Sequence, residues 1–399
     1  MSSTSPQLSP APKPYFQALD GFRGLFALFV AIHHTTWYSY ANYGSFINEA
    51  FVIIDLFFAL SGFLMFYLYK NSLNNSLDVA KFLKKRVARL YPLHVFMLFV
   101  FIGFACVRIL AHEFGFATYE LGETLPFHKG ADEGWRSVFY HLTLTHSIGL
   151  QDSLTFNYPS WTISTEFFTY IFFAALILWA RPTKAWHYGL ISMGIAAIFA
   201  LLSFVKPNMD ITYDLGLLRC LAGFFIGGVA AYVFSEITSR KDMISLKDRK
   251  AFKLGFTALE ALTLIACYVF VTYCTGSLQF FAAPFLFLFI CVFAFDGGYI
   301  SNFMSQKIFG YLAKISYSVY MTHVIFAIIF AIMYERLLPG MAQTPEEFSG
   351  GLNGDLLLIP YMLAVVGFSH LTWKFVEIPG GRFLRNLNLG ISQRGSMPL

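Results

Sequence analysis

The first apolar segment of the chain carries side chains that could take part in chemistry. Residues 19–38 read LDGFRGLFALFVAIHHTTWY and contain Arg23, His33 and His34. In a helix, the 11-residue step from Arg23 to His34 is three turns with a mismatch of about 20°, so both side chains share one face. They would lie roughly 16 Å apart along the axis, whereas His33 is rotated by about 100°. We therefore expect His34 to be the functional partner of Arg23, and His33 to pack or form hydrogen bonds.

Four more ionisable residues stand in later apolar segments: Asp55, Glu166, Arg219 and His323. With a rise of about 1.5 Å per residue, each reaches the depth estimated for His34, which is about 9 Å from the outer end of its segment. A charge at membrane depth costs on the order of 2.5–3.5 kcal/mol, so such groups usually face the protein interior and pair. Two imidazoles and two carboxylates in one layer predict an acid–base site. The alternative is that these residues only hold helices together.

A second group of cations lies in the segment KFLKKRVARLYP, residues 81–92. Arg86 and Arg89 are three residues apart, so they share a helix face. Guanidinium groups suit phosphate oxygens, and Arg23 could join them. The alternative is ordinary cytoplasmic charge bound to anionic lipid headgroups. An anion site joined to an acid–base site by one helix face would fit an extended donor such as coenzyme A, with phosphates at one end and a thioester at the other.

The elements that must position these residues are apolar helices. The chain is 57% hydrophobic and 13% charged, whereas about a quarter of the residues of a soluble domain are charged. We predict an all-α integral membrane protein with about ten transmembrane helices. The apolar runs long enough to span hydrocarbon are residues 19–40, 51–69, 92–112, 161–180, 186–205, 214–235, 256–274, 278–296, 309–334 and 354–375.

The distribution of basic residues predicts the orientation of the chain. Most of the 28 Lys and Arg residues fall on the side of the N-terminus, so the positive-inside rule places both termini in the cytoplasm. We expect a flexible tail over 1–18, a transmembrane domain over 19–380 and a cytoplasmic tail over 381–399. This topology explains the net charge of +5 without a nucleic-acid partner.

Other reactive residues make weaker candidates. His141 and His146 are five residues apart, off a common helical face, and are expected to make a poor metal pair; we expect no metal. Ser61 and Ser164 lack the sequence of a nucleophile elbow. The five cysteines lie in apolar segments without metal-type spacing and are interpreted as packing residues.

Taken in order, these motifs resemble those of the acyltransferase-3 family of multi-pass membrane acyltransferases. LDGFRGLFALFVAIHH matches the opening motif, an Arg followed by ten residues and a His, and IIDLFFALSGFLM matches the acidic motif of the second helix. The two arginines at 86 and 89 are a further family feature. PSWTISTEFFTY resembles a Trp-Ser-Leu-x-x-Glu motif, with Thr162 and Ile163 in place of Ser-Leu. FGYLAKISYSVYMTH matches a late Tyr-Ser-x-Tyr-x-x-His motif, and FVEIPGGR resembles the closing one.

The resemblance implies acyl transfer, often of acetyl, from a cytoplasmic acyl-CoA to an acceptor beyond the membrane. That acceptor is commonly a sugar hydroxyl of a polysaccharide or lipid-linked glycan. We therefore expect acetyl-CoA or another acyl-CoA as donor, a place in a bacterial inner membrane among its lipids, and compatibility with an oligomer. Some relatives carry an added extracytoplasmic hydrolase-like domain. This chain stops soon after its last apolar segment, which favours an enzyme acting alone or with a separate partner.

The expected roles follow from the motifs and the spacing together. His34 would act as general base on the acceptor hydroxyl or carry the acyl group transiently, and Glu166 or Asp55 would hold its tautomer. Arg23, Arg86 and Arg89 would bind the CoA phosphates. The residues expected to bind substrate are Trp161, Tyr317, Tyr320, His323 and Arg219, the last either on an anionic acceptor or in a structural ion pair.

A transporter is the alternative from another functional class. Intramembrane histidines and carboxylates would then form a proton relay. The sequence shows no inverted repeat and no paired interrupted helices of the kind that transporters often have, so the enzyme is the favoured interpretation.

Overall fold

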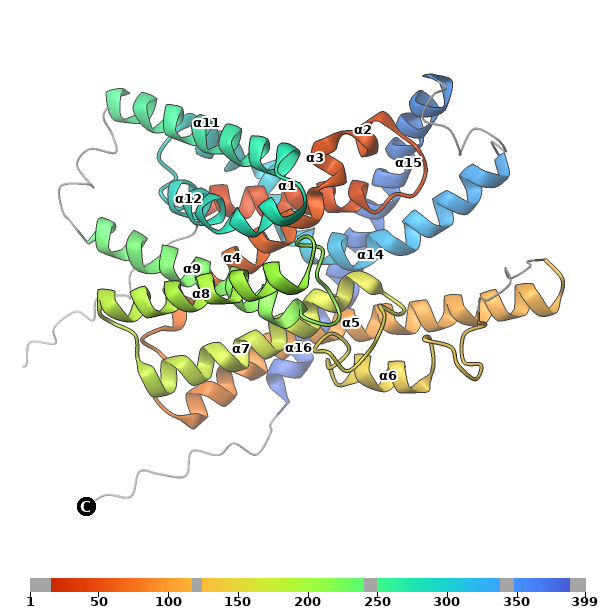
Figure 1. The fold of residues 1–399 in the computed structure, drawn as a ribbon. Helices are drawn as coiled ribbons and strands as arrows, with labels where there is room; N and C mark the ends of the chain where they lie inside the picture. The colour runs from red at the N-terminus through yellow and green to blue at the C-terminus, as the bar shows by residue number, and fades with distance from the viewer. Residues whose placement is uncertain (1–15, 117–123, 240–249, 338–347, 388–399) are drawn as a thin grey trace, which may run out of the picture.

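The computed structural model describes residues 16–116, 124–239, 250–337 and 348–387, and every regular element among them is helical (Figure 1). Nine of these helical stretches are long and apolar enough to cross a membrane. The prediction of an all-α, multi-pass membrane protein is therefore confirmed. Of the expected tails, residues 1–15 and 388–399 lie outside the described residues, while residues 17 and 18 and residues 381–386 are helical.

Within each described range, the helices follow one another along the chain with short connections, apart from the segment that leads to α7. Their bounds are α1 (Gln17–His33), α2 (Tyr40–Tyr43), α3 (Ser45–Asn48), η1 (Ala50–Val52), α4 (Ile53–Tyr69), α5 (Ser76–Glu113), α6 (Trp135–Leu142), η2 (Tyr158–Ser160), α7 (Trp161–Ala180), α8 (Ala185–Val205), α9 (Gly216–Thr238), α11 (Lys250–Tyr273), η3 (Gly276–Phe281), α12 (Ala282–Ala294), α13 (Tyr299–Met304), α14 (Lys307–Leu337), α15 (Phe348–Thr372), the π-helical η4 (Trp373–Glu377) and α16 (Ile378–Asn386).

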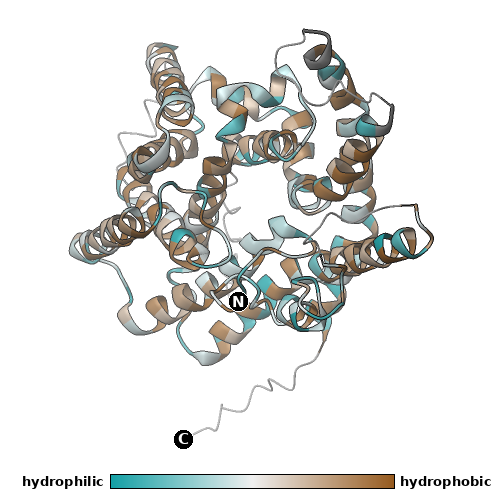
Figure 2. Cartoon of the chain, turned by 45° about the vertical axis from the view of Figure 1, so that its right-hand side comes forward, coloured by the Kyte–Doolittle hydropathy of each residue, from teal (hydrophilic) through white to brown (hydrophobic). Residues whose placement is uncertain are grey.

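The outer surface of the helical stretches is apolar, as a lipid contact requires. Large side chains on α8, α11 and α15 are exposed, among them Phe204, Leu262 and Leu363. Figure 2 shows hydrophobic residues along most of the helices and hydrophilic ones concentrated in the connections. Such extensive apolar exposure is unusual on a soluble monomer, and here it marks the surface that faces the hydrocarbon chains of the membrane lipids.

The first helix is shorter than the sequence predicted. The expected segment 19–40 ends as a helix at His33, and α1 has 17 residues. The Thr35 hydroxyl donates to the Ile32 carbonyl at 2.8 Å, a local bond that competes with helix continuation. The Trp37 indole N–H donates to the Gly354 carbonyl of α15 at 3.1 Å, which draws the chain away from the helix axis. His34 therefore sits at the end of α1 instead of two turns before it.

Helices α4 and α9 approach each other closely because glycines line their contact. A Cβ on Gly227 would lie 1.8 Å from the Ala59 carbonyl oxygen, and a Cβ on Gly62 would lie 1.8 Å from that of Phe224. Gly223 stands four residues before Gly227 and also faces α4. This small-xxx-small packing is the usual means of bringing membrane helices together, and it fixes how the polar residues of α4 and α9 face one another.

Candidate active site

An arginine-lined cavity of about 200 Å³ lies between five helices, α1, α4, α5, α7 and α14. The sequence placed Arg86 and Arg89 on one helix face, and the continuous helix α5 presents both to this cavity. Six of the expected site residues line it together: Arg23, Arg86, Arg89, Glu166, Tyr317 and Tyr320. The three arginines proposed as a phosphate site therefore line one cavity.

Two of the three arginines already have carboxylate partners. Arg23 pairs with Asp20 at 2.8 Å and also donates to the Ala313 carbonyl of α14 at 3.1 Å. Arg89 pairs with Glu377, and its guanidinium lies over the ring of Tyr317 at 5.3 Å. Their charges are thus largely balanced before any ligand binds.

Arg86 differs from the other two, because no carboxylate among the described residues pairs with it. Its guanidinium lies 5.6 to 5.8 Å from the ring centres of Tyr69, Phe82 and Tyr170. Its Nε is buried and lacks a hydrogen-bond partner. Aromatic faces attract a cation without neutralising it, so Arg86 is the cation of this cavity most available to an anion.

Glu166 also belongs to this cavity. Its Oε1 accepts hydrogen bonds from the Ser61 hydroxyl at 2.6 Å and from the Tyr170 hydroxyl at 2.5 Å. The ring of Tyr170 faces Arg86, so Tyr170 contacts both the Glu166 carboxylate and the Arg86 guanidinium. Ser61 is thereby used as a donor to Glu166. Ser164, the other serine considered, donates to the buried Leu144 carbonyl at 2.6 Å.

Beyond the cavity, His34 is held by a second imidazole. His34 Nδ1 lies 2.9 Å from the Val30 carbonyl oxygen and 3.0 Å from His323 Nε2. His323 Nδ1 lies 3.1 Å from the Val319 carbonyl oxygen. A carbonyl only accepts, so both Nδ1 atoms carry hydrogen, and His323 Nε2 accepts from His34. This assignment leaves the lone pair of His34 on Nε2, which has no hydrogen-bond partner among the described residues.

The sequence predicted a carboxylate as the partner of His34, and the structure shows His323 in that position. Neither Glu166 nor Asp55 forms a hydrogen bond with His34. His323 was expected to line a substrate pocket. It is instead fully buried and forms a hydrogen bond with His34. His33 donates from Nδ1 to the Ile47 carbonyl at 2.8 Å, which confirms its expected hydrogen-bonding role.

The cavity and the imidazole pair are connected along α1 and through Tyr320. Arg23 and Ala27 of α1 both line the cavity, and His34 follows Ala27 by seven residues, two turns further on the same face. The Tyr320 ring lines the cavity and lies 5.9 Å from that of His323. One face of α1 therefore connects the arginine-lined cavity with the imidazole of His34.

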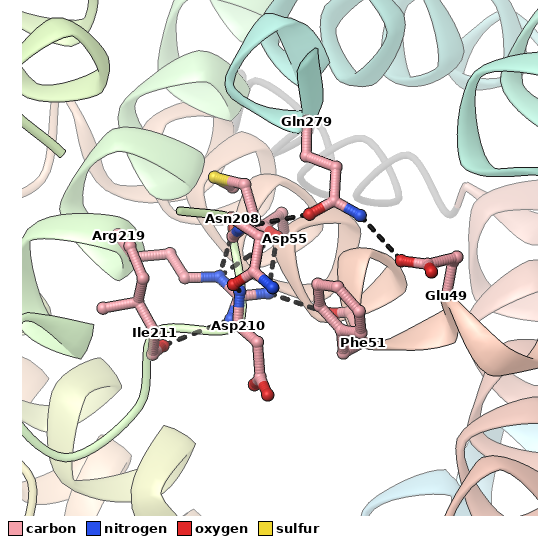
Figure 3. A network of polar contacts seen from close by, with 9 residues as sticks. Glu49, Phe51, Asp55, Asn208, Asp210, Ile211, Arg219 and Gln279 are labelled. Atoms are coloured by element: carbon pink, nitrogen blue, oxygen red, sulfur yellow. Dashed lines mark hydrogen bonds and ion pairs between the residues drawn. The ribbon is translucent and has the colours of Figure 1, made fainter. Parts of the chain in front are cut away.

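Asp55 and Arg219 form a separate, fully buried ion pair (Figure 3). Arg219 Nη2 lies 2.8 Å from Asp55 Oδ2, and Nε lies 3.1 Å from Oδ1. The guanidinium also donates to the carbonyls of Ile211 at 3.2 Å and Phe51 at 2.8 Å. Trp161, expected to bind substrate, lies over this guanidinium at 5.4 Å and is not among the residues that line the cavity. Of the two roles considered for Arg219, the structural ion pair is the one observed.

Several site residues were not selected from the sequence. Tyr170 follows Glu166 by four residues, so helical spacing could have identified it as a neighbour on the same face. Glu377 belongs to FVEIPGGR, but its pairing with Arg89 joins residues nearly 300 positions apart, which no local pattern shows. Tyr158, whose ring lies 5.3 Å from that of His34, gave no signal in the sequence.

Comparisons with known proteins identify the family of the chain. A family described as an acyltransferase domain, acyltransferase-3, matches residues 16–376. "Protein 2 in picA locus" of Rhizobium radiobacter is 37% identical over 105 residues, which is 26% of this chain and 53% of that protein. The chain thus covers about half the length of this curated relative. No solved structure gives a significant match.

Proposed function

Because the chain belongs to the acyltransferase-3 family of membrane acyltransferases, we propose that it is an O-acyltransferase using cytoplasmic acyl-CoA. Acetyl is the acyl group that we favour. The proposed acceptor is a sugar hydroxyl of an extracytoplasmic or lipid-linked glycan. The observation that carries the proposal is the single face of α1. It runs from Arg23 in the arginine-lined cavity to His34, whose Nε2 has no hydrogen-bond partner among the described residues. The protein works among the lipids of a bacterial inner membrane.

The donor enters from the side of the arginines. A cavity of about 200 Å³ is smaller than the 300–1,000 Å³ usual for ligand pockets, so it takes the narrow arm of CoA and leaves the nucleotide at its mouth. Arg86 supplies the charge for a phosphate, since Arg23 and Arg89 are each paired with a carboxylate. Glu166 and Tyr170 hold the cavity wall beside Arg86.

His34 acts as the general base of the transfer. Its Nε2 takes the proton from the acceptor hydroxyl while the hydroxyl oxygen attacks the thioester carbonyl. The C–S bond then breaks, and the imidazolium returns the proton to the leaving CoA sulfur, so that CoA departs as the thiol. A positioned base typically contributes 10²–10⁴-fold to rate.

Two features stabilise the imidazolium that forms on His34. His323 Nε2 accepts a hydrogen bond from Nδ1–H of His34. This contact holds His34 in the tautomer whose Nε2 is free to take up a proton. His34 also stands at the C-terminal end of α1, where the helix dipole favours a positive charge by about 0.3–1 kcal/mol, and more when partly buried. The same Nε2 could carry the acyl group, and an acyl-histidine trapped by acid quench would show that route.

The test compares cell-surface glycans by mass spectrometry in cells with the protein, without it, and with His34→Ala. We expect O-acyl groups in the first strain alone, with equal membrane expression of both protein forms. Identical O-acylation in all three strains would refute the proposal. Solute uptake into proteoliposomes that lack acyl-CoA would instead support the transporter.

A further inference from the structure

A cluster of three histidines lies outside the proposed active site. His94 comes from α5, His141 from the last turn of α6, and His146 from the segment that follows α6. One ring nitrogen from each lies within 4.8 Å of the others. Only 1%, 1% and 3% of their respective surfaces are exposed. From the sequence, His141 and His146 were expected to make a poor metal pair because residues five apart do not share a helix face. That reason does not apply, because α6 ends at Leu142 and His146 lies beyond it.

The hydrogen bonds of the cluster decide which nitrogens face its centre. His94 Nε2 donates to the His141 carbonyl at 3.0 Å, and His146 Nε2 donates to the Ser160 carbonyl at 3.0 Å. His141 Nε2 is bonded to the Thr155 hydroxyl at 3.0 Å. A histidine whose Nε2 donates to a carbonyl has its lone pair on Nδ1. Outer contacts of this kind are those that orient metal-binding histidines.

In each histidine of the cluster, Nδ1 is buried and has no hydrogen-bond partner among the described residues. When the Thr155 hydroxyl accepts from His141 Nε2, His141 also has its lone pair on Nδ1. One metal ion can accept all three lone pairs, whereas a water molecule has only two hydrogens to donate.

The ring spacing agrees with this interpretation for two of the three pairs. Imidazoles bound tetrahedrally at about 2.0–2.1 Å have ring centres about 5 Å apart. The centres of His94 and His146 are 5.4 Å apart, and those of His94 and His141 are 5.8 Å apart. All three pairs of rings are nearly parallel, with interplanar angles of 10° to 17°, and His141 and His146 are stacked with their centres 4.0 Å apart. For an ion to enter, these two rings must therefore separate by about 1 Å and turn, so that their in-plane lone pairs meet at one point.

We propose that His94, His141 and His146 bind a divalent transition-metal ion through their Nδ1 atoms, with zinc the best match. Three neutral imidazoles suit zinc, copper, nickel or cobalt better than magnesium or calcium. Water would complete a tetrahedral shell. The site does not depend on the proposed acyl transfer, because none of its ligands lines the arginine cavity.

The ion would join three parts of the chain that lie next to elements of the candidate active site. His94 anchors it to α5, and His141 to α6, which lies beside α5 (Figure 1). His146 bonds to Ser160, the residue before α7, and α7 carries Glu166. The ion is therefore placed to fix the segment between α5 and α7 and the start of α7.

The experiment uses the full chain purified in detergent with a histidine-free tag, and elemental mass spectrometry covering manganese to zinc. We expect about one equivalent of metal per chain, loss of it on prolonged chelation, and recovery with zinc accompanied by a rise in Tm. Cobalt added to the stripped protein should give the visible absorption of tetrahedral Co²⁺. These measurements need no variant to fold.

The variants His94→Asn, His141→Asn and His146→Asn should each lose the metal and the zinc-dependent rise in Tm. His128→Asn is the matched control, since His128 is an exposed histidine of the same connecting segment and should keep both. Wild-type protein that holds less than a tenth of an equivalent and shows no Tm response to zinc or cobalt would overturn the proposal. So would a folded triple variant that binds as much metal as the wild type.

Discussion

Replacing Arg219 with methionine should destabilise the fold, because it leaves the Asp55 carboxylate buried without a counter-ion. Both side chains are 0% exposed, and breaking such a pair from one side costs about 3–5 kcal/mol. The carbonyls of Ile211 and Phe51 also lose their donor, at about 1–3 kcal/mol for a buried group left unsatisfied. The single variant should therefore melt several degrees lower in detergent or fail to accumulate.

The informative perturbation is the double variant, Asp55→Leu with Arg219→Met. It removes both charges, and replacing a buried ion pair with apolar residues is often neutral or stabilising. It should regain most of the 3–5 kcal/mol and keep only the cost of the two carbonyls. Thermal unfolding and CoA release from acyl-CoA would be measured on both variants. If the ion pair is structural, the double variant retains transfer.

The opposite result would refute this reasoning. A double variant that folds with near-wild-type Tm but has lost transfer as completely as His34→Ala would give Asp55 or Arg219 a direct role in the chemistry. A double variant less stable than Arg219→Met would show that the buried pair contributes net stability.

Three other predictions follow from particular contacts. Arg86→Gln should raise KM for acyl-CoA about 10- to 100-fold, the loss of one charge-assisted contact, whereas Lys81→Gln on the exposed side of α5 should leave KM unchanged; equal KM values would exclude Arg86 from donor binding. Gly227→Leu should separate α4 from α9 and lower the Tm, since even its Cβ would meet the Ala59 carbonyl at 1.8 Å, while Gly255→Ala meets nothing within 4 Å and should be neutral. His323→Ala should lower kcat with little change in KM, and His323→Gln, which keeps an acceptor for His34, should restore part of it; equal loss in both variants would contradict the positioning role.

The sequence was sufficient for those parts of the site that depend on a single helix. The face shared by Arg23 and His34 follows from 3.6 residues per turn, and so does the face shared by Arg86 and Arg89. The end of α1 could not be predicted in this way, because it depends on a bond from Trp37 to Gly354 on a distant helix.

The pairings between helices were also beyond sequence reasoning. Depth alone placed Asp55, Glu166 and the two imidazoles in one layer, but depth gives no direction around a helix axis. In the structure, the side chains point in different directions: Asp55 pairs with Arg219, Glu166 lines the arginine cavity, and His34 bonds to His323. The contact of His94 with His141 and His146 likewise depends on how the segment after α5 returns along that helix.

The central claim is that His34 is the base that receives the acceptor's proton. It is tested most directly by acceptor-dependent CoA release from acetyl-CoA in proteoliposomes, measured for wild type, His34→Ala and the control His33→Ala. We expect His34→Ala to lose at least 10²-fold in kcat. His33→Ala should keep most of its activity, because His33 Nδ1 is bonded to the Ile47 carbonyl and its ring only packs edge-on against that of His34, with centres 5.0 Å apart. Full activity in correctly inserted His34→Ala, or an equal loss in both variants, would contradict the account.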